Sequence, residues 1–184
     1  MKKALALAGA TLTAALVSGM PAHADTLNVQ GVVAPYCNIT LTNVSSGTVS
    51  IAFTDTQKVA NLRVACNAAS GTKVTLDPAN GDLLSSNNVD RINYAMTLKS
   101  PSDPAFNIAE TDTAPGGANN IGKFTRSHVG YSQAIASGIP LELWLNVNVQ
   151  GEPQPDFSTP NVFHADAAPA GTYTESFDFS VTQV

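Results

Sequence analysis

The feature that most constrains the fold is an alternation of apolar and other residues with a period of two. It is clearest between residues 141 and 149, where leucine or valine occupies every odd position. The even positions hold Glu142, Trp144, Asn146 and Asn148. Successive side chains of a β-strand point to opposite faces, so this segment predicts a strand with one buried and one solvated face.

The same period recurs along the chain, whereas helical spacing does not recur after residue 24. Further strands are expected around Ile39–Leu41, Val49–Phe53, Leu62–Cys66, Val74–Leu76, Ile92–Leu98 and Tyr173–Val181. Turn sequences such as Asn80-Gly81-Asp82 separate these runs. Residues 101–120 are polar and predict a long irregular connection, anchored by Phe106 and Ile108. Short strands at this spacing predict an all-β sandwich in one domain.

The last expected strand has Tyr173, Phe177, Phe179 and Val181 on its inward face. Glu175 interrupts that face near the start of the strand.

The first 24 residues have the pattern of a bacterial secretory signal peptide. Lys2 and Lys3 precede an apolar run, which ends in the small-residue sequence Pro21-Ala22-His23-Ala24. Cleavage is expected after Ala24, and no later stretch has the roughly 20 apolar residues that a membrane span needs. The sequence therefore predicts an exported protein with no membrane span in residues 25–184.

Charge and motifs argue against several functions. The net charge is −5 and no lysine or arginine cluster is present, which argues against a nucleic-acid partner. His128 and His164 have no metal-ligand spacing, and the sequence holds no nucleophile or phosphate-binding motif. We therefore expect no enzyme activity, no metal and no cofactor.

Cys37 and Cys66 are the only cysteines of the chain. In an exported protein such a pair predicts a disulfide, the alternative being two buried free thiols. The bond would close a loop of about 30 residues and contribute roughly 3–4 kcal/mol in the chain-entropy model.

Residues 25–33, just before the first cysteine, form a short alternating segment of their own. Leu27, Val29, Gly31 and Val33 share one face, with a gap at Gly31. Two interpretations remain open from the pattern. The segment could be the first strand of the protein's own sheet, or a free arm that joins the sheet edge of a neighbouring molecule.

Together these features resemble a known family. They are the leader, the alternating segment, Tyr36-Cys37-Asn38-Ile39-Thr40, Leu62-Arg63-Val64-Ala65-Cys66 and the ending Pro169-Ala-Gly-Thr-Tyr-Thr-Glu-Ser-Phe-Asp-Phe-Ser-Val181. The chain is similar to chaperone–usher pilins, and most similar to the spore coat protein U-like branch with its archaic pilus subunits. Gln183, next to last, departs from the aromatic residue that many pilins of the better-known branch carry there.

The resemblance implies an immunoglobulin-like sandwich that lacks its final strand, formed by residues 34–184. Residues 25–33 would be the donor-strand arm, with Leu27, Val29, Gly31 and Val33 as its inserted face. The disulfide would join the first two core strands. The strand with Tyr173, Phe177, Phe179 and Val181 would border the acceptor groove and meet the chaperone.

The expected function is that of a structural subunit of a pilus, fimbria or surface coat, assembled by donor-strand exchange and serving adhesion. Its expected partners are a periplasmic chaperone, an outer-membrane usher and other copies of itself or related pilins. Its expected location is the periplasm and then the cell surface. The alternative is a self-contained secreted binding module that recognises a glycan or receptor, with Trp144 as a candidate ligand contact.

Overall fold

A computed structural model of the chain describes residues 29–44, 47, 49, 56–111, 121–147, 162–163 and 168–184. The chain divides into two units, Met1–Val33 and Ala34–Val184. The helices and strands described below belong to the second unit. The predicted strand at Val49–Phe53 lies mostly outside the described residues, as do Leu27, His164 and residues 112–120.

The largest sheet has five strands. Its order is β1 (Cys37–Asn43), β2 (Gln57–Cys66), β9 (Ile139–Asn146), β6 (Ala95–Lys99) and β7 (Ile108–Thr111). All neighbours in it are antiparallel. Leu62, Val64, Leu141 and Leu143 are almost fully buried, while the residues between them on each strand are more exposed. The alternation of the sequence therefore produces one buried and one solvated face.

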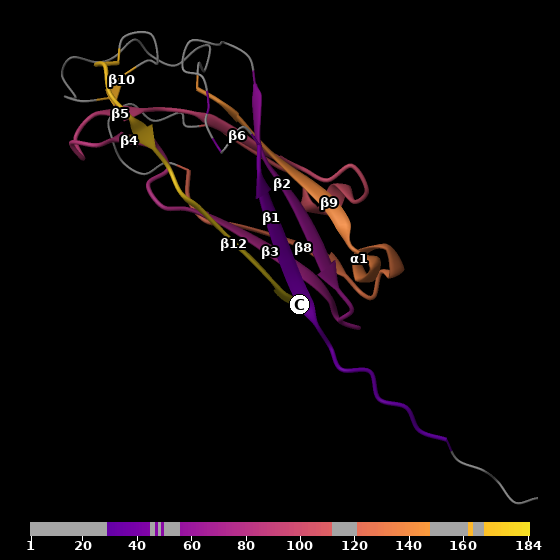
Figure 1. The fold of residues 1–184 in the computed structure, drawn as a ribbon. Helices are drawn as coiled ribbons and strands as arrows, with labels where there is room; N and C mark the ends of the chain where they lie inside the picture. The colour runs from indigo at the N-terminus through magenta and orange to yellow at the C-terminus, as the bar shows by residue number, and fades with distance from the viewer. Residues whose placement is uncertain are drawn as a thin grey trace, which may run out of the picture. The chain divides into compact units, whose positions relative to one another are not determined.

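A second sheet of three antiparallel strands lies against the first (Figure 1). Its order is β12 (Phe177–Gln183), β3 (Gly71–Pro78) and β8 (Phe124–Val129). A smaller sheet lies at one end, in the order β10 (Val162–Phe163), β5 (Arg91–Ile92), β4 (Leu83–Ser85) and β11 (Tyr173–Thr174). A short 3-10 helix, η2 (Pro104–Phe106), and a helix, α1 (Gln133–Ser137), complete the described elements.

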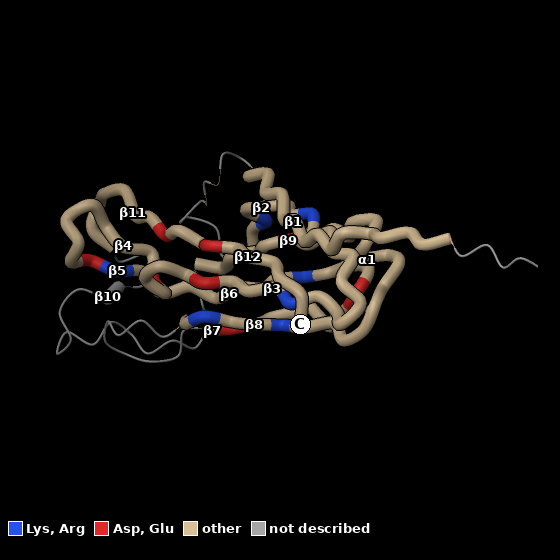
Figure 2. Tube along the Cα trace, turned by 90° about the horizontal axis from the view of Figure 1, so that it is seen from below, with Lys and Arg blue, Asp and Glu red and all other residues tan. Residues whose placement is uncertain are grey.

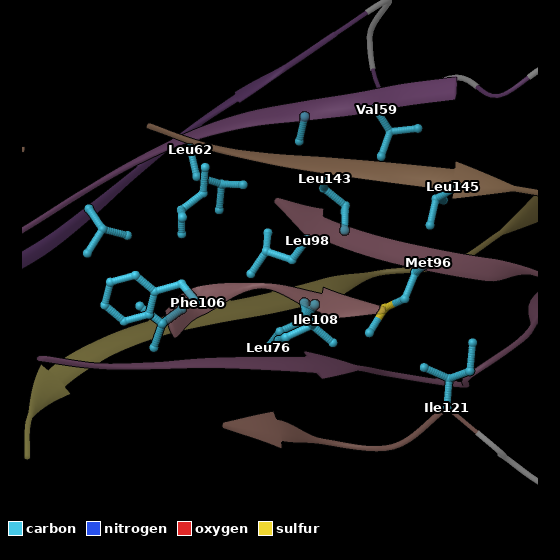
Figure 3. Packing of buried hydrophobic residues seen from close by; sticks show 14 of the residues in the cluster. Val59, Leu62, Leu76, Met96, Leu98, Phe106, Ile108, Ile121, Leu143 and Leu145 are labelled. Atoms are coloured by element: carbon cyan, nitrogen blue, oxygen red, sulfur yellow. The ribbon is translucent and has the colours of Figure 1, made fainter. Parts of the chain in front are cut away.

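The core fills the space between the two larger sheets (Figure 3). Leu98 and Leu143 of the five-stranded sheet point toward the same interior as Leu76 of β3. Phe106 of η2 is fully buried, and Ile108 beside it is nearly so. The all-β sandwich predicted from the sequence is thus confirmed, and Phe106 and Ile108 are the anchors expected for the connection after β6.

The strand order contains that of an immunoglobulin sandwich, with β7 added beside β6 and β8 added beside β3. In that fold one sheet holds strands A, B, E and D, and the other holds C, F and G. Here β1, β2, β9 and β6 occupy the places of A, B, E and D, and β3 and β12 occupy those of C and F. Among the described strands none lies beside β12 in the place of strand G.

Two predicted strands are interrupted in the structure. Ile92–Leu98 is divided between β5 and β6, and Tyr173–Val181 between β11 and β12. At the second break both Glu175 carboxylate oxygens accept a hydrogen bond from the Asn80 backbone N–H at 3.1 Å, and Ser176 N–H donates to the same carboxylate at 2.7 Å. Glu175 thus ties the turn after β3 to the point where the chain passes from the small sheet to the three-stranded sheet.

Sequence analysis missed six of the described elements, which are the strands β4, β7, β8 and β10 and the helices η2 and α1. Strand β7 begins within the stretch expected to be irregular, and neither β8 nor α1 was predicted. In β8 the more buried positions, Phe124, Arg126 and His128, include a cation and an imidazole, so the strand has no apolar face to read from its sequence. Helix α1 has only five residues, fewer than a periodic pattern needs to appear.

Candidate functional site: an open groove between two strand edges

The site with the clearest functional geometry is an open edge of the sandwich. Strand β12 pairs only with β3, and β1 pairs only with β2, among the strands that the structure describes. These two strands run alongside each other from opposite sheets (Figure 1). An edge strand presents unpaired N–H and C=O groups, which makes it a template for another strand.

The backbone register shows which groups face this edge. In an antiparallel pair, alternate residues direct their N–H and C=O groups to the partner. Val184 N–H donates to Gly71 C=O at 3.1 Å, and Gly71 is in register with Val184 in the ladder that pairs Gln183 with Thr72. The even-numbered residues of β12 therefore face β3. The N–H groups of Phe177 and Phe179 point to the opposite edge.

The same argument applies to β1. Tyr36 C=O accepts from Asn67 N–H at 3.0 Å, and Val44 N–H donates to Val59 C=O at 2.8 Å. Even-numbered residues of β1 therefore face β2, and Leu41 and Asn43 direct their backbone groups away from it. Both strands thus offer hydrogen-bonding groups to the space between them.

That space is a groove of about 520 Å³. It is lined by Leu41 and Asn43 of β1, Phe177 and Phe179 of β12, and Tyr173 of β11, and its floor includes Val59, Leu143 and Leu145. Gly47, Val49, Ala60, Leu83, Thr172, Thr174, Glu175 and Ser176 complete the lining. Leu41 is an exposed leucine, and Phe177 and Phe179 are only partly buried although they pack on the core.

The groove lining carries one charged side chain, Glu175, and its carboxylate is held by the backbone of the turn at Asn80. Figure 2 shows acidic and basic residues interspersed over the sheets. Burial raises the pKa of the Tyr173 hydroxyl above its usual value, with the charge of Asp90 acting in the same direction. That hydroxyl donates to Pro169 C=O at 2.9 Å. The groove therefore suits an uncharged, extended, apolar occupant.

Sequence analysis placed Tyr173, Phe177, Phe179 and Val181 at the border of this groove. The structure brings the first three together in the groove lining. Val181 lies further along β12 and packs on the core outside the lining. Leu41, Val59 and Leu143 were missed as lining residues, because a period of two gives the face of a strand and not its place at an open edge.

The predicted disulfide between Cys37 and Cys66 is present. The two cysteines are directly opposite each other in the β1–β2 ladder, so the bond joins the first two strands of the sandwich. Asn67, the next residue after Cys66, accepts from Tyr36 N–H at 2.6 Å and donates to Ala34 C=O at 3.1 Å. The Tyr36 hydroxyl donates to Ala136 C=O of α1 at 2.6 Å. The chain is therefore fixed to the sandwich from Ala34 onward.

Residues 29–36 form no strand. The side chains of Val29 and Val33 are 84% and 83% exposed, and a Cβ on Gly31 would meet no atom within 4 Å. Leu27, the fourth residue of the predicted donor face, lies outside the described residues. Val32, on the other face of the segment, is exposed as well. A short segment with exposed apolar side chains is typical of one that packs on another surface.

Trp144, the candidate ligand contact, lies on the outer face of the five-stranded sheet. The ammonium groups of Lys58 and Lys99 lie 5.6 and 5.2 Å from the ring centroid, within cation–π range. Its indole N–H donates to Glu142 at 3.1 Å, and Lys58 binds the same carboxylate at 3.1 Å. The Lys58 hydrogen bond lowers the pKa of Glu142, and the Trp144 hydrogen bond and the charge of Lys99 act the same way. The indole is therefore partnered within the sheet.

The remaining polar candidates form local contacts. His128 Nδ1 lies 2.6 Å from Asp103, the residue that caps η2. Within the described ranges no three His, Cys, Asp or Glu side chains gather in a group able to hold a metal ion. No helix in the part of the chain that the structure describes is long and apolar enough to cross a membrane.

Comparison with known proteins adds no further assignment. No protein-family model matches the chain, and no curated protein matches it.

Proposed function

We propose that this protein is an exported structural subunit that polymerises by strand complementation, each copy inserting residues 25–33 into the groove of the next. The observation that carries the proposal is the open groove between β1 and β12, which has an apolar floor and, among the described strands, an unpaired backbone edge on each side. The disulfide supports export, because such bonds persist in oxidising compartments.

The chemistry of the arm complements that of the groove. Val29 and Val33 are exposed, as is Val32 on the other face of the segment, while the groove offers Leu41, Phe177 and Phe179. Insertion of four alternating positions buries on the order of 300–400 Å² of apolar surface, about 8–10 kcal/mol at roughly 25 cal/mol per Å² before ordering costs. Such a gain is comparable with the roughly 5–15 kcal/mol stability of an ordinary domain.

An unfilled groove exposes apolar surface and strand edges, which favours aggregation. The proposal therefore includes a periplasmic chaperone that occupies the groove before assembly, and an outer-membrane usher at which the arm of the next subunit replaces it. These partners, and a place in a pilus or surface coat similar to those of the spore coat protein U-like family, follow from the resemblance given above.

The test is stability with and without a supplied strand. Residues 34–184 are compared with the same chain carrying residues 25–33 after Val184, joined by a flexible linker of about four residues, as in a short hairpin. The appended segment would then run antiparallel to β12. We expect it to make the protein monomeric and to raise its thermal midpoint by 10 °C or more.

A matched control carries the same appended segment with Leu27→Asn, Val29→Asn and Val33→Asn, which keeps the backbone and removes the apolar face. Equal stability of the two appended forms would contradict the proposal. If deletion of residues 25–33 unfolds an otherwise monomeric protein, and the appended copy does not restore it, the segment belongs to its own sheet. The self-contained binding module would then be the better account.

A further inference from the structure

The exposed apolar side chains of residues 34–184 gather at the two ends of the sandwich. Apart from Leu41 in the groove, the large exposed hydrophobic residues of this unit, in its described part, are Tyr36, Val89, Val129, Tyr131 and Val184. Four of the five surround the turn between β2 and β3. The fifth, Val89, lies in the turn between β4 and β5. This distribution suggests that the two ends of the sandwich take part in the same contact between molecules.

The larger cluster, which we call the root patch, consists of Val129, Tyr131, Val184 and Tyr36. Val129 is in register with Gly71, and Val184 N–H donates to Gly71 C=O, so the two valines flank the same glycine. They are 79% and 51% exposed, and Tyr131, two residues beyond Val129, is 54% exposed. Tyr36 is bonded to α1 and Asn67 at the same end. The four residues of the root patch therefore lie at one end of the sandwich, on backbone that is held by hydrogen bonds.

Val89 is exposed on a turn that is fixed by several hydrogen bonds. Asn87 Oδ1 accepts from Val89 N–H at 2.8 Å and from Asp90 N–H at 3.1 Å, and Asn87 also donates to the Asp90 carboxylate at 2.6 Å. Ser85 N–H donates to Asp90 C=O at 2.8 Å. The backbone of this turn therefore holds Val89 in an exposed position. Ser86 N–H donates to Thr172 C=O, so this turn lies beside β11, near the start of β12.

The short covalent link between the arm and the sandwich determines which molecule lies next to the root patch. Only residues 34–36 separate the donor arm from Cys37, and Asn67 fixes Ala34 and Tyr36 to the body. A molecule whose groove holds residues 25–33 is thus brought next to the root patch. If the inserted arm is antiparallel to β12, as the pairs of both large sheets are, its Val33 end lies beside Phe177 of the acceptor. That is the end of the acceptor that carries Val89.

We propose that the root patch of one copy packs on the Val89 turn of the copy whose groove holds its arm. This inference rests on the proposed function and adds a second contact between successive subunits. The contact is heterologous, joining two different surfaces, and so is compatible with an open, linear polymer. The root patch has four residues, compared with roughly 20–30 residues per partner in a stable interface, so it acts only when the arm supplies a high effective concentration.

The test is photo-cross-linking in polymers of the full chain, produced in its own cells, with Tyr131 replaced by p-benzoylphenylalanine. Half of the copies are isotopically heavy, so a cross-link between copies is recognised by its mass. We expect the cross-link to reach residues 86–90 of a second copy. Val89→Asp is expected to lower its yield at least fivefold, whereas the matched change Ala109→Asp on β7 is expected to leave it unchanged.

Arm insertion is measured separately, by the presence of polymers of increasing size that resist detergent and form a ladder. A ladder with no cross-link between copies, or with one that reaches Val129 or Val184 of the second copy, overturns this inference and leaves the proposed function intact. The absence of a ladder in the unmodified chain overturns both.

Discussion

At Gly71 three strands meet with no room for a side chain. Its φ is +120°, and a Cβ there would lie 2.2 Å from the carbonyl oxygen of His128. The backbone around it cannot move away easily, because Gly71 C=O accepts from Val184 N–H and Val129 pairs with it from β8. The register of the three-stranded sheet therefore depends on the absence of a side chain at this residue.

Gly71→Ala is expected to lower the free energy of unfolding by about 2–4 kcal/mol, through backbone strain and displacement of β8. Gly122→Ala is the matched control, because a Cβ there meets no atom within 4 Å. Denaturant unfolding of both variants measures the difference. Similar stabilities for the two would show that β8 is held much less firmly than its register suggests.

Glu142 makes the stability depend on pH. Its pKa in the folded protein is lowered, first by the hydrogen bond from Lys58. A carboxyl with a depressed folded pKa stabilises the fold above its unfolded pKa of about 4.3, and that stabilisation is lost as the pH falls through the folded pKa. Glu142→Gln should therefore destabilise the protein at pH 7 and have a smaller effect at pH 3.

The measurement for Glu142 is the urea midpoint at both pH values, with Glu110→Gln on β7 as the control. Because Glu142 is partly exposed, solvent screening keeps the effect small. An equal loss at pH 7 and pH 3 would mean that packing, and not charge, accounts for the effect of Glu142→Gln.

Among the elements, β1 is the one most dependent on a covalent link. It is an edge strand whose last four residues are exposed, so little apolar burial holds it. The disulfide joins its first residue to the last residue of β2. Cys37→Ala with Cys66→Ala should cost about 2–4 kcal/mol.

In that double variant, backbone amide exchange should rise in β1 more than in β9, the central strand of the same sheet. A uniform change in β1 and β9 would contradict a local role for the bond. The comparison is made by hydrogen exchange of the two proteins at neutral pH.

The alternation in the sequence shows which face of a strand is buried. It does not show which strands lie at the edge of a sheet. The alternation of Leu141, Leu143 and Leu145 gave the buried face of β9 correctly, because burial of one face leaves a direct pattern. Strand β8 was not predicted because its half-buried positions include Arg126 and His128, which give the strand no apolar face. Which strands lie at the open edge depends on pairings between distant segments, such as β2 with β9, that no local pattern contains.

At the scale of the whole molecule, the fold is an immunoglobulin-type sandwich whose two larger sheets both end in a strand bordering the groove. The root of the donor arm, held by Asn67 and Tyr36, lies at the end with the root patch. The groove opens toward the start of β12, because its lining includes Phe177 and Phe179. The attachment point of the arm at Ala34–Tyr36 and the groove lining thus lie toward opposite ends of the sandwich, which is an arrangement that suits a linear chain of subunits.

The most direct test of strand complementation is hydrogen exchange of β12, measured by NMR in the protein with the appended segment and in its asparagine-substituted control. The N–H groups of Asp178 and Ser180 face β3 and should be protected in both proteins. Those of Phe177 and Phe179 face the groove, and we predict that their exchange slows at least tenfold only when the apolar segment is supplied. Equal exchange of Phe177 and Phe179 in the two proteins would contradict the account.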